Sequence, residues 1–119
     1  LRNDIIWSKG NPMPESAKDR FTRSHEYVFL FSHPESGGKY YFDAHSVREP
    51  SRADYFQEDG YRNRRTVWDI NTKPFGGAHF AVWPTELVEL MVVAGSPVDG
   101  TVLDPFSGSA TTGAVAQPM

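Results

Sequence analysis

The chain has 119 residues, enough for one small domain with a modest core. It contains no cysteine, which excludes disulfide bonds and thiolate metal sites, and no run of residues approaches the ~20 apolar residues of a membrane span. The formal net charge of −3 argues against a general nucleic-acid binder. We therefore expect a cytoplasmic protein with no membrane partner. Because the chain opens at Leu1 without a starting Met or a signal-peptide pattern, we also expect it to be part of a longer protein.

The first elements in chain order predict an antiparallel hairpin. Residues 4–7 form a short apolar run rich in strand formers, and the two prolines of residues 11–14 end it. Residues 10–24 are polar and predict an unusually long loop, of the kind that is functional or mobile. Residues 25–32, HEYVFLFS, give the strongest strand signal in the chain. Pairing of these two strands gives the hairpin.

The middle of the chain has weaker signals. Residues 33–39 contain a proline and two glycines and predict a turn, and residues 40–42 predict a short strand. Residues 43–65 are polar without a clear period and predict irregular structure, or one weak helix around residues 52–57. Residues 66–70 predict a short extended segment.

A helix and a strand–turn–helix unit are predicted in the last third. Pro84 near the start and Gly95 at the end bound a helix whose apolar face carries Leu87, Leu90, Met91 and Ala94. Residues 101–104 predict a short buried strand, residues 105–110 a turn of small residues, and residues 111–116 the start of a helix. No Lys or Arg occurs from residue 74 onward and four acids do, giving −4, whereas residues 1–73 carry +1. The later part is therefore better suited to a core or a small-molecule site than to a phosphate backbone.

The strand–turn–helix unit at residues 101–116 is typical of a cofactor-binding edge in a doubly wound sheet. Small residues let a ligand approach the backbone, and free amides at a helix start can receive an anion. Asp104 would orient the ligand or structure the turn. A plain connection explains the same residues nearly as well, with Asp104 as a cap or turn residue, Phe106 in the core and Gly108 at a left-handed position. Both interpretations stay open on these residues alone.

Three stretches resemble one family of enzymes. Residues 104–113, DPFSGSATTG, resemble the DPFxGSGTTG cofactor loop of S-adenosylmethionine-dependent adenine-N6 and cytosine-N4 DNA methyltransferases. Residues 79–89, HFAVWPTELVE, resemble the HFAxFPxxLxE segment that precedes this loop in the permuted enzymes. IIWSK, NPMPES and HEY, within residues 5–27, resemble a third stretch of the same enzymes. Their order fits the β class, in which the catalytic half comes first. The resemblance implies an α/β fold, a partial Rossmann-like methyltransferase domain with an antiparallel hairpin.

The resemblance also implies a division of the single partial domain, residues 1–119, and roles for its residues. Residues 1–42 would form the hairpin and a DNA-facing loop, residues 43–72 a target-recognition insert, and residues 73–119 the cofactor-binding segment. The residues implied to bind S-adenosylmethionine are Asp104, Phe106, Ser107, Gly108, Ser109, Thr111, His79 and Phe80.

Contact with double-stranded DNA is implied for seven residues of the first two segments. An isolated histidine such as His79 is more often a satisfied, partly buried residue than a ligand contact, and an arginine-rich turn is often only a solvated one. The tryptophans are more often packing residues than base-stacking platforms. The implied DNA-binding residues are Lys9, Asn11, Arg20, Arg23, Arg62, Arg64 and Arg65.

The sequence departs from the family pattern in four ways. The catalytic (Asp/Asn/Ser)-Pro-Pro-(Tyr/Phe/Trp) tetrapeptide, which holds the flipped base, does not occur in the 119 residues and is expected upstream of Leu1. An acidic residue for the ribose hydroxyls would lie beyond Met119. Ala110 stands where the family has Gly, and Gln117, Pro118 and Met119 stand where a longer helix is expected.

From these departures we expect no catalytic residue and no metal site in this chain. We expect methyl transfer to an exocyclic amine of DNA only in an intact enzyme, with the chain inactive on its own. The missing half would come from a partner chain, or the chain would form a homodimer. The alternative function is a non-catalytic DNA-binding or protein-binding remnant of such an enzyme.

Overall fold

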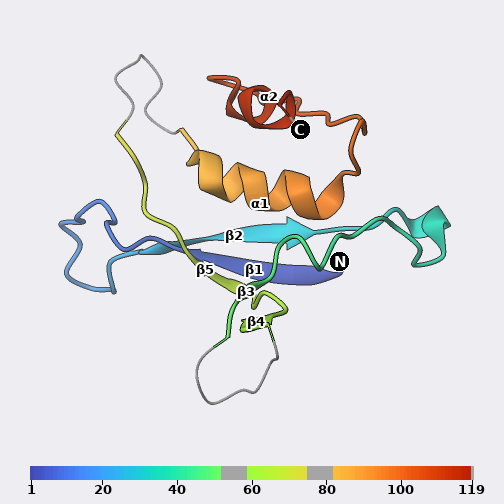
Figure 1. Cartoon of the computed structure of the whole chain (residues 1–119). Coiled ribbons are helices and arrows are strands. Elements are labelled where there is room, and N and C mark those ends of the chain that lie inside the picture. Colours follow the sequence, from blue (N-terminus) through green and yellow to red (C-terminus); the bar gives the residue numbers. More distant parts are fainter. Residues whose placement is uncertain (52–58, 75–81, 119) are drawn as a thin grey trace.

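The computed structural model describes residues 1–51, 59–74 and 82–118. A three-stranded sheet of order β2–β1–β5 is built from β1 (Asn3–Ser8), β2 (His25–Leu30) and β5 (Val67–Asp69). Helix α1 (Thr85–Gly95) lies against this sheet, and helix α2 (Thr111–Ala116) lies on the far side of α1 (Figure 1). A two-stranded ladder, β3 (Glu49–Pro50) with β4 (Tyr61–Arg62), and a 3-10 turn, η1 (Pro34–Ser36), complete the described elements. The fold is a mixed α/β arrangement with small sheets.

The predicted hairpin is confirmed. β1 and β2 pair antiparallel, with Ile5 opposite Val28 and Trp7 opposite Glu26. Side chains alternate between the two faces of a strand, so Ile5 and Trp7 point to one face and are buried, at 8% and 3% exposure. The connection of residues 10–24 is irregular, as its prolines and polar residues predict.

The extended segment predicted at residues 66–70 is also confirmed, but its partner is a strand sixty residues earlier. β5 pairs parallel with β1, with Trp7 opposite Trp68. The Trp7 Nε1 atom donates to the Ile70 carbonyl at 2.8 Å in the core, which satisfies the one polar atom of a buried side chain. Such a parallel pair requires a long crossover, here residues 9–66, and no local pattern predicts it.

Helix α1 joins the sheet to the last segment of the chain. The predicted helix is confirmed, with the Pro84 carbonyl accepting from the Leu87 and Val88 amides. Leu87 is 1% exposed and packs with Trp7 and Ile70, while Leu90 and Met91 border this cluster. Burying one such side chain stabilises the fold by about 2 kcal/mol. Val88 and Val92 are also buried and line the side facing residues 101–104, so α1 is covered on two sides.

Two predicted strands are wrong. Residues 101–104 do not form a strand, because no strand in the described ranges lies beside them to supply ladder hydrogen bonds. Leu103 is 86% exposed instead of buried. Residues 40–42 run past α1 without pairing, and the chain is held there by the Asp43 amide, which donates to the Ala94 carbonyl at 2.9 Å. The weak helix predicted at residues 52–57 lies outside the described residues.

Candidate cofactor and DNA-facing sites

The turn between residues 104 and 112, here called the cofactor turn, is organised by one carboxylate. The Asp104 Oδ1 atom accepts from the Phe106 amide at 2.9 Å, and Oδ2 accepts from the Thr112 hydroxyl at 2.7 Å. Asp104 therefore ties the start of the turn to the first residues of α2. Of the two roles open to this side chain from the sequence, structuring the turn is the one with contacts in the described residues.

Two residues of the cofactor turn have left-handed backbone conformations. Gly108 has φ +50°, and Ala110, which precedes α2, has φ +61°. The Ala110 amide donates to the Ser107 carbonyl at 2.7 Å, which closes the turn at this angle. A side chain in the left-handed region costs roughly 1–2 kcal/mol, whereas glycine adopts it freely. The turn thus requires the geometry that glycine provides at both positions, and the chain has glycine at only one.

The outer surface of the cofactor turn is open. Phe106 is 92% exposed, so a core role for this aromatic is wrong, and Ser107 and Gly108 are exposed as well. Ser109 and Thr111 are half-buried, and their hydroxyls lie 3.0 Å apart within hydrogen-bond distance. An exposed aromatic beside small residues and hydroxyl groups fits a ligand with a flat apolar part and a polar end.

A hollow of about 410 Å³ separates the cofactor turn from α1. Its lining includes Asp104 and Thr112 on one side and Val88 and Val92 on the other, with Trp83 at the edge. Trp83 is 50% exposed, and sequence reasoning assigned it to packing. The sequence places Trp83 just before α1. Its proximity to the cofactor turn depends on how α1 and the turn pack together, which the sequence does not specify. His79 and Phe80, the other implied cofactor residues, lie outside the described residues.

The loop of residues 10–24, which the resemblance implies to face DNA and which is here called the DNA-facing loop, is anchored at its base to the end of β5. Asn11 is the main anchor: its Oδ1 atom accepts from the Thr72 amide at 3.0 Å and its Nδ2 atom donates to the Thr72 carbonyl at 2.9 Å. The Gly10 amide donates to Asn71 Oδ1 at 3.0 Å. Asn71 and Thr72 were not singled out in the sequence, because their partners are sixty-one residues away.

The basic residues implied to face DNA have different surroundings. Lys9 forms an ion pair with Glu26 and lies 4.6 Å from the centroid of the Trp7 ring. Arg20 lies in the loop, 3.4 Å from Glu15, and Arg23 is exposed there. The side chains of Lys9 and Asn11 thus contribute to the base of the loop, while the two arginines lie on its surface.

The remaining three arginines lie on the β3–β4 ladder and the segment after it. Arg62 pairs with Glu49 at 2.8 Å across the ladder, and Arg64 donates to the Val47 carbonyl at 2.8 Å. Arg65 donates to the Asn63 carbonyl at 2.9 Å and is otherwise exposed. Two of these guanidinium groups therefore hold the insert together.

Among the described residues of the insert implied at residues 43–72, two carboxylates, Asp43 and Asp59, have a lowered pKa. Hydrogen bonds from Ser46 lower the pKa of Asp43. Hydrogen bonds from the Tyr61 amide and from Arg48 lower the pKa of Asp59 below its usual value. The Arg48–Asp59 ion pair joins the two ends of the connection between β3 and β4. No group of three or more potential metal ligands occurs among the described residues, and none of the described helices has the length and apolarity to cross a bilayer.

A glycine-containing turn that opens a helix beside an α/β sheet defines a candidate cofactor-binding domain. The chain belongs to the N6/N4 DNA methylase family, whose model, described as DNA methylase, matches residues 1–119. The family uses S-adenosylmethionine and acts on DNA. The resemblance read from the sequence is thus confirmed at the level of the family.

Curated relatives extend this match. The chain is 54% identical over 119 residues to the type II methyltransferase M.SmaI of Serratia marcescens, covering 100% of this chain and 39% of the relative. It is 53% identical over 117 residues to M.Cfr9I of Citrobacter freundii, covering 98% of this chain and 36% of the relative. It is 50% identical over 117 residues to M.XycI of Xanthomonas campestris pv. cyanopsidis, with the same coverages. The chain therefore spans less than two fifths of the length of these relatives.

Proposed function

We propose that this chain supplies the cofactor turn and part of the DNA-facing surface of a DNA amino-methyltransferase. The reaction is methyl transfer from S-adenosylmethionine to N6 of adenine or N4 of cytosine. The observation that carries the proposal is the cofactor turn, in which the Asp104 carboxylate fixes an open loop of small residues at the start of a helix. The family's description, DNA methylase, supports a DNA substrate, and the relatives' names support methyl transfer.

The cofactor turn fits the proposed ligand through its exposed groups. Phe106 offers an aromatic face, and the Gly108 backbone is accessible, since a Cβ there would meet nothing closer than the Phe106 carbonyl at 3.9 Å. Ser107, Ser109 and Thr111 add hydroxyl groups along the same turn. The bound cofactor supplies the methyl group. The residues of the cofactor turn bind and orient it, and the neighbouring hollow lies beside the turn, since Asp104 and Thr112 line it.

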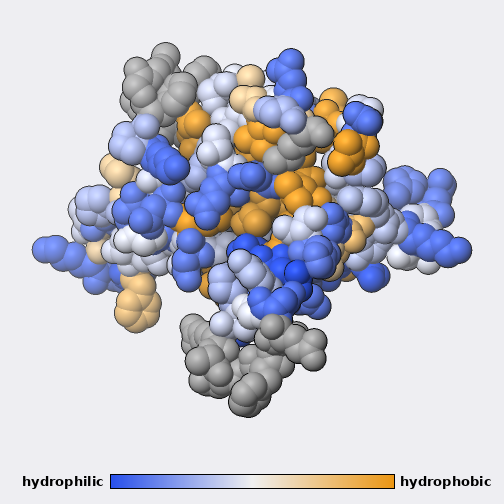
Figure 2. Space-filling view, in the orientation of Figure 1, coloured by the Kyte–Doolittle hydropathy of each residue, from blue (hydrophilic) through white to orange (hydrophobic). Residues whose placement is uncertain are grey.

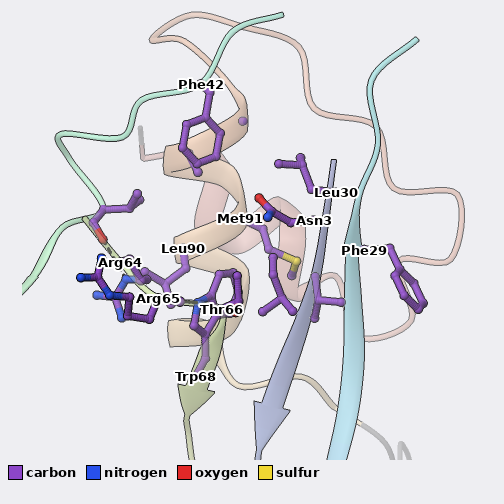
Figure 3. Close-up of a pocket in the computed structure, with 15 residues that line it drawn as sticks. Asn3, Phe29, Leu30, Phe42, Arg64, Arg65, Thr66, Trp68, Leu90 and Met91 are labelled. Carbon is purple, nitrogen blue, oxygen red and sulfur yellow. Dashed lines mark hydrogen bonds between the residues drawn. The ribbon is translucent and has the colours of Figure 1, made fainter. Parts of the chain in front are cut away.

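The sheet supports a domain completed by further protein. Tyr27 and Phe29 lie on the sheet face away from α1, and Phe31 follows directly after β2; the three side chains are 52%, 52% and 66% exposed. Figure 3 shows the Phe29 ring pointing away from α1. Sheets with parallel strands are normally covered on both faces. Figure 2 shows hydrophobic side chains gathered over the helical half of the molecule and hydrophilic ones over the β3–β4 ladder. We infer that the chain is one share of a Rossmann-like domain, and that the rest of the enzyme, a partner chain or a second copy covers the aromatic face.

The DNA-facing surface is proposed to combine Arg20 and Arg23 on the loop with Arg62, Arg64 and Arg65 on the insert. Lys9 and Asn11 form the base of the loop and contribute through its position. The catalytic tetrapeptide of the family does not occur in these residues. The chain alone therefore binds cofactor without transferring a methyl group.

Calorimetric titration of the chain with S-adenosylmethionine tests the proposal. Saturable binding is expected for the wild type, and Asp104→Ala is expected to lose it because the turn opens. Thr112→Val, which removes one of the two bonds to Asp104, should weaken binding by about fivefold. Glu89→Gln, on the exposed side of α1, is the matched control and should bind as the wild type does. A folded wild-type chain with no affinity for the cofactor would refute the proposal and favour a non-catalytic remnant.

A further inference from the structure

The most exposed of the large apolar side chains in the described residues is not explained by the proposed cofactor site. Phe21 lies in the DNA-facing loop and is 98% exposed, the highest value among the large hydrophobic residues of the described chain. A phenylalanine this exposed contributes almost no buried apolar area to the fold. Its neighbours along the loop are Lys18, Arg20 and Arg23, with Asp19 as the one acid between residues 18 and 23. An exposed aromatic ring with cationic residues on both sides along the chain matches a nucleic acid, which presents stacked bases between phosphates.

The loop holds Phe21 in a defined place. At its neck the Lys9 amide donates to the Ser24 carbonyl at 2.8 Å, and Asn11 is bound to Thr72 by the hydrogen bonds described above. Figure 1 shows the loop extending from the end of the β1–β2 hairpin, away from the helices. A hollow of about 570 Å³ lies in the second half of the loop, lined by Glu15, by residues 20–24 and by His25 at the start of β2. The ring therefore projects from a fixed base.

The position in the sheet points to the same ligand. The loop and the segment after β5 both leave the sheet at the carboxyl ends of the parallel strands β1 and β5. In open α/β sheets ligands bind at that edge. The aromatic row of Tyr27, Phe29 and Phe31 is a different surface, since it follows the face of a sheet, where the acidic residue Asp4 lies opposite Phe29. Met13, in the same loop, is 83% exposed but lies between two prolines, not between cations.

We propose that Phe21 is a wedge that inserts between base pairs of duplex DNA, while Arg20 and Arg23 contact the flanking phosphates. This inference rests on the proposed function, in which the chain faces DNA. Enzymes that act on a base within a duplex must take it out of the stack, and apolar wedges unstack base steps in this way. With this wedge the chain takes part in opening the duplex, although its sequence does not contain the family's tetrapeptide that holds the flipped base.

Fluorescence anisotropy with two labelled duplexes tests the wedge. One duplex is intact, and the other has an abasic site, where insertion costs less unstacking. The wild-type chain should bind the abasic duplex several-fold more tightly than the intact one. Phe21→Ala should abolish this preference and lower affinity for the abasic duplex about tenfold. Phe21→Trp should retain both, and Met13→Ala, the matched control in the same loop, should behave as the wild type.

Each other outcome overturns the inference. If Phe21→Ala keeps the wild-type preference for the abasic duplex, Phe21 does not insert between base pairs. Equal losses in Phe21→Ala and Met13→Ala show that the loop responds to any loss of apolar surface. If Phe21→Ala lowers self-association in sedimentation and leaves DNA affinity unchanged, the residue is a contact between copies. A chain that binds S-adenosylmethionine but no duplex also refutes the wedge, whereas a wedge on a chain without cofactor affinity refutes only the proposed cofactor role.

Discussion

The two connections that carry the proposed function, the cofactor turn and the DNA-facing loop, are held by different kinds of contact. The cofactor turn is fixed locally: Asp104 reaches two and eight residues along the chain. The DNA-facing loop is fixed by contacts across sixty-one residues, from Gly10 and Asn11 to Asn71 and Thr72. The first can form wherever its sequence occurs, whereas the second exists only once β1 and β5 have paired. Local turns therefore survive a loss of tertiary structure better than long-range anchors do.

The largest effect is expected from the core that brings the two anchors of the loop together. Trp7→Ala should lower the free energy of unfolding by about 3–5 kcal/mol, because Trp7 is 3% exposed and bonded to Ile70. Urea unfolding followed by circular dichroism measures this loss. Leu103→Ala, at a residue 86% exposed beside the cofactor turn, is the control and should change the value by less than about 0.5 kcal/mol. Equal losses of unfolding free energy in the two variants would show that the two regions contribute alike to stability.

The next effect concerns the long-range anchor. Asn11→Ala removes three hydrogen bonds with Thr72 and should cost about 1–2 kcal/mol. Limited proteolysis should cut within residues 10–24 faster in this variant than in the wild type. Asn11→Asp keeps the acceptor for the Thr72 amide but loses the donor to the Thr72 carbonyl. Its rate of cleavage should therefore lie between those of the wild type and Asn11→Ala. Unchanged cleavage of the loop in Asn11→Ala would mean that the anchor does not position it.

A smaller effect, of opposite sign, is expected in the cofactor turn. Ala110→Gly should raise the stability by up to about 1 kcal/mol, because glycine relieves the left-handed conformation at φ +61°. The gain is reduced by the greater freedom of glycine in the unfolded chain. Thermal melting measures it, with Ala114→Gly within α2 as a control that should destabilise. A lower melting temperature for Ala110→Gly would show that the turn carries no strain at this position.

The smallest expected effect is a pH dependence of the stability, which comes from Asp59 in the insert. The pKa of Asp59 is lowered in the folded chain, so its contribution is present above the ordinary aspartate pKa and is lost as the pH falls through the lower folded value. Asp59→Asn should flatten the acid side of the stability curve and leave the neutral region nearly unchanged. Melting temperatures from pH 7 down to pH 3 check this. An acid limb identical in the variant and the wild type would contradict it.

Most of the cofactor turn could be predicted from the sequence, because its contacts join close neighbours. The small residues, the helix start at Thr111 and a structural role for Asp104 all follow from residues 101–116. The strand predicted at residues 101–104 failed for a physical reason: apolar residues become a strand only beside another strand, and sequence patterns do not specify whether one is present. Exposure of Phe106 could not be predicted, since an aromatic is buried or exposed according to what lies opposite.

The sequence alone determined the family, the antiparallel hairpin, the helix that ends at Gly95 and the local chemistry of the cofactor turn. Periodicity and short motifs encode these features, because they depend on residues within about one element of each other. Only the tertiary structure decided that β5 pairs with β1, that Asn11 anchors a loop through Thr72, and that Trp83 borders the cofactor turn. These features depend on contacts between distant residues, and such contacts form only when burial of Trp7, Ile70 and Leu87 offsets the entropy of closing the intervening chain.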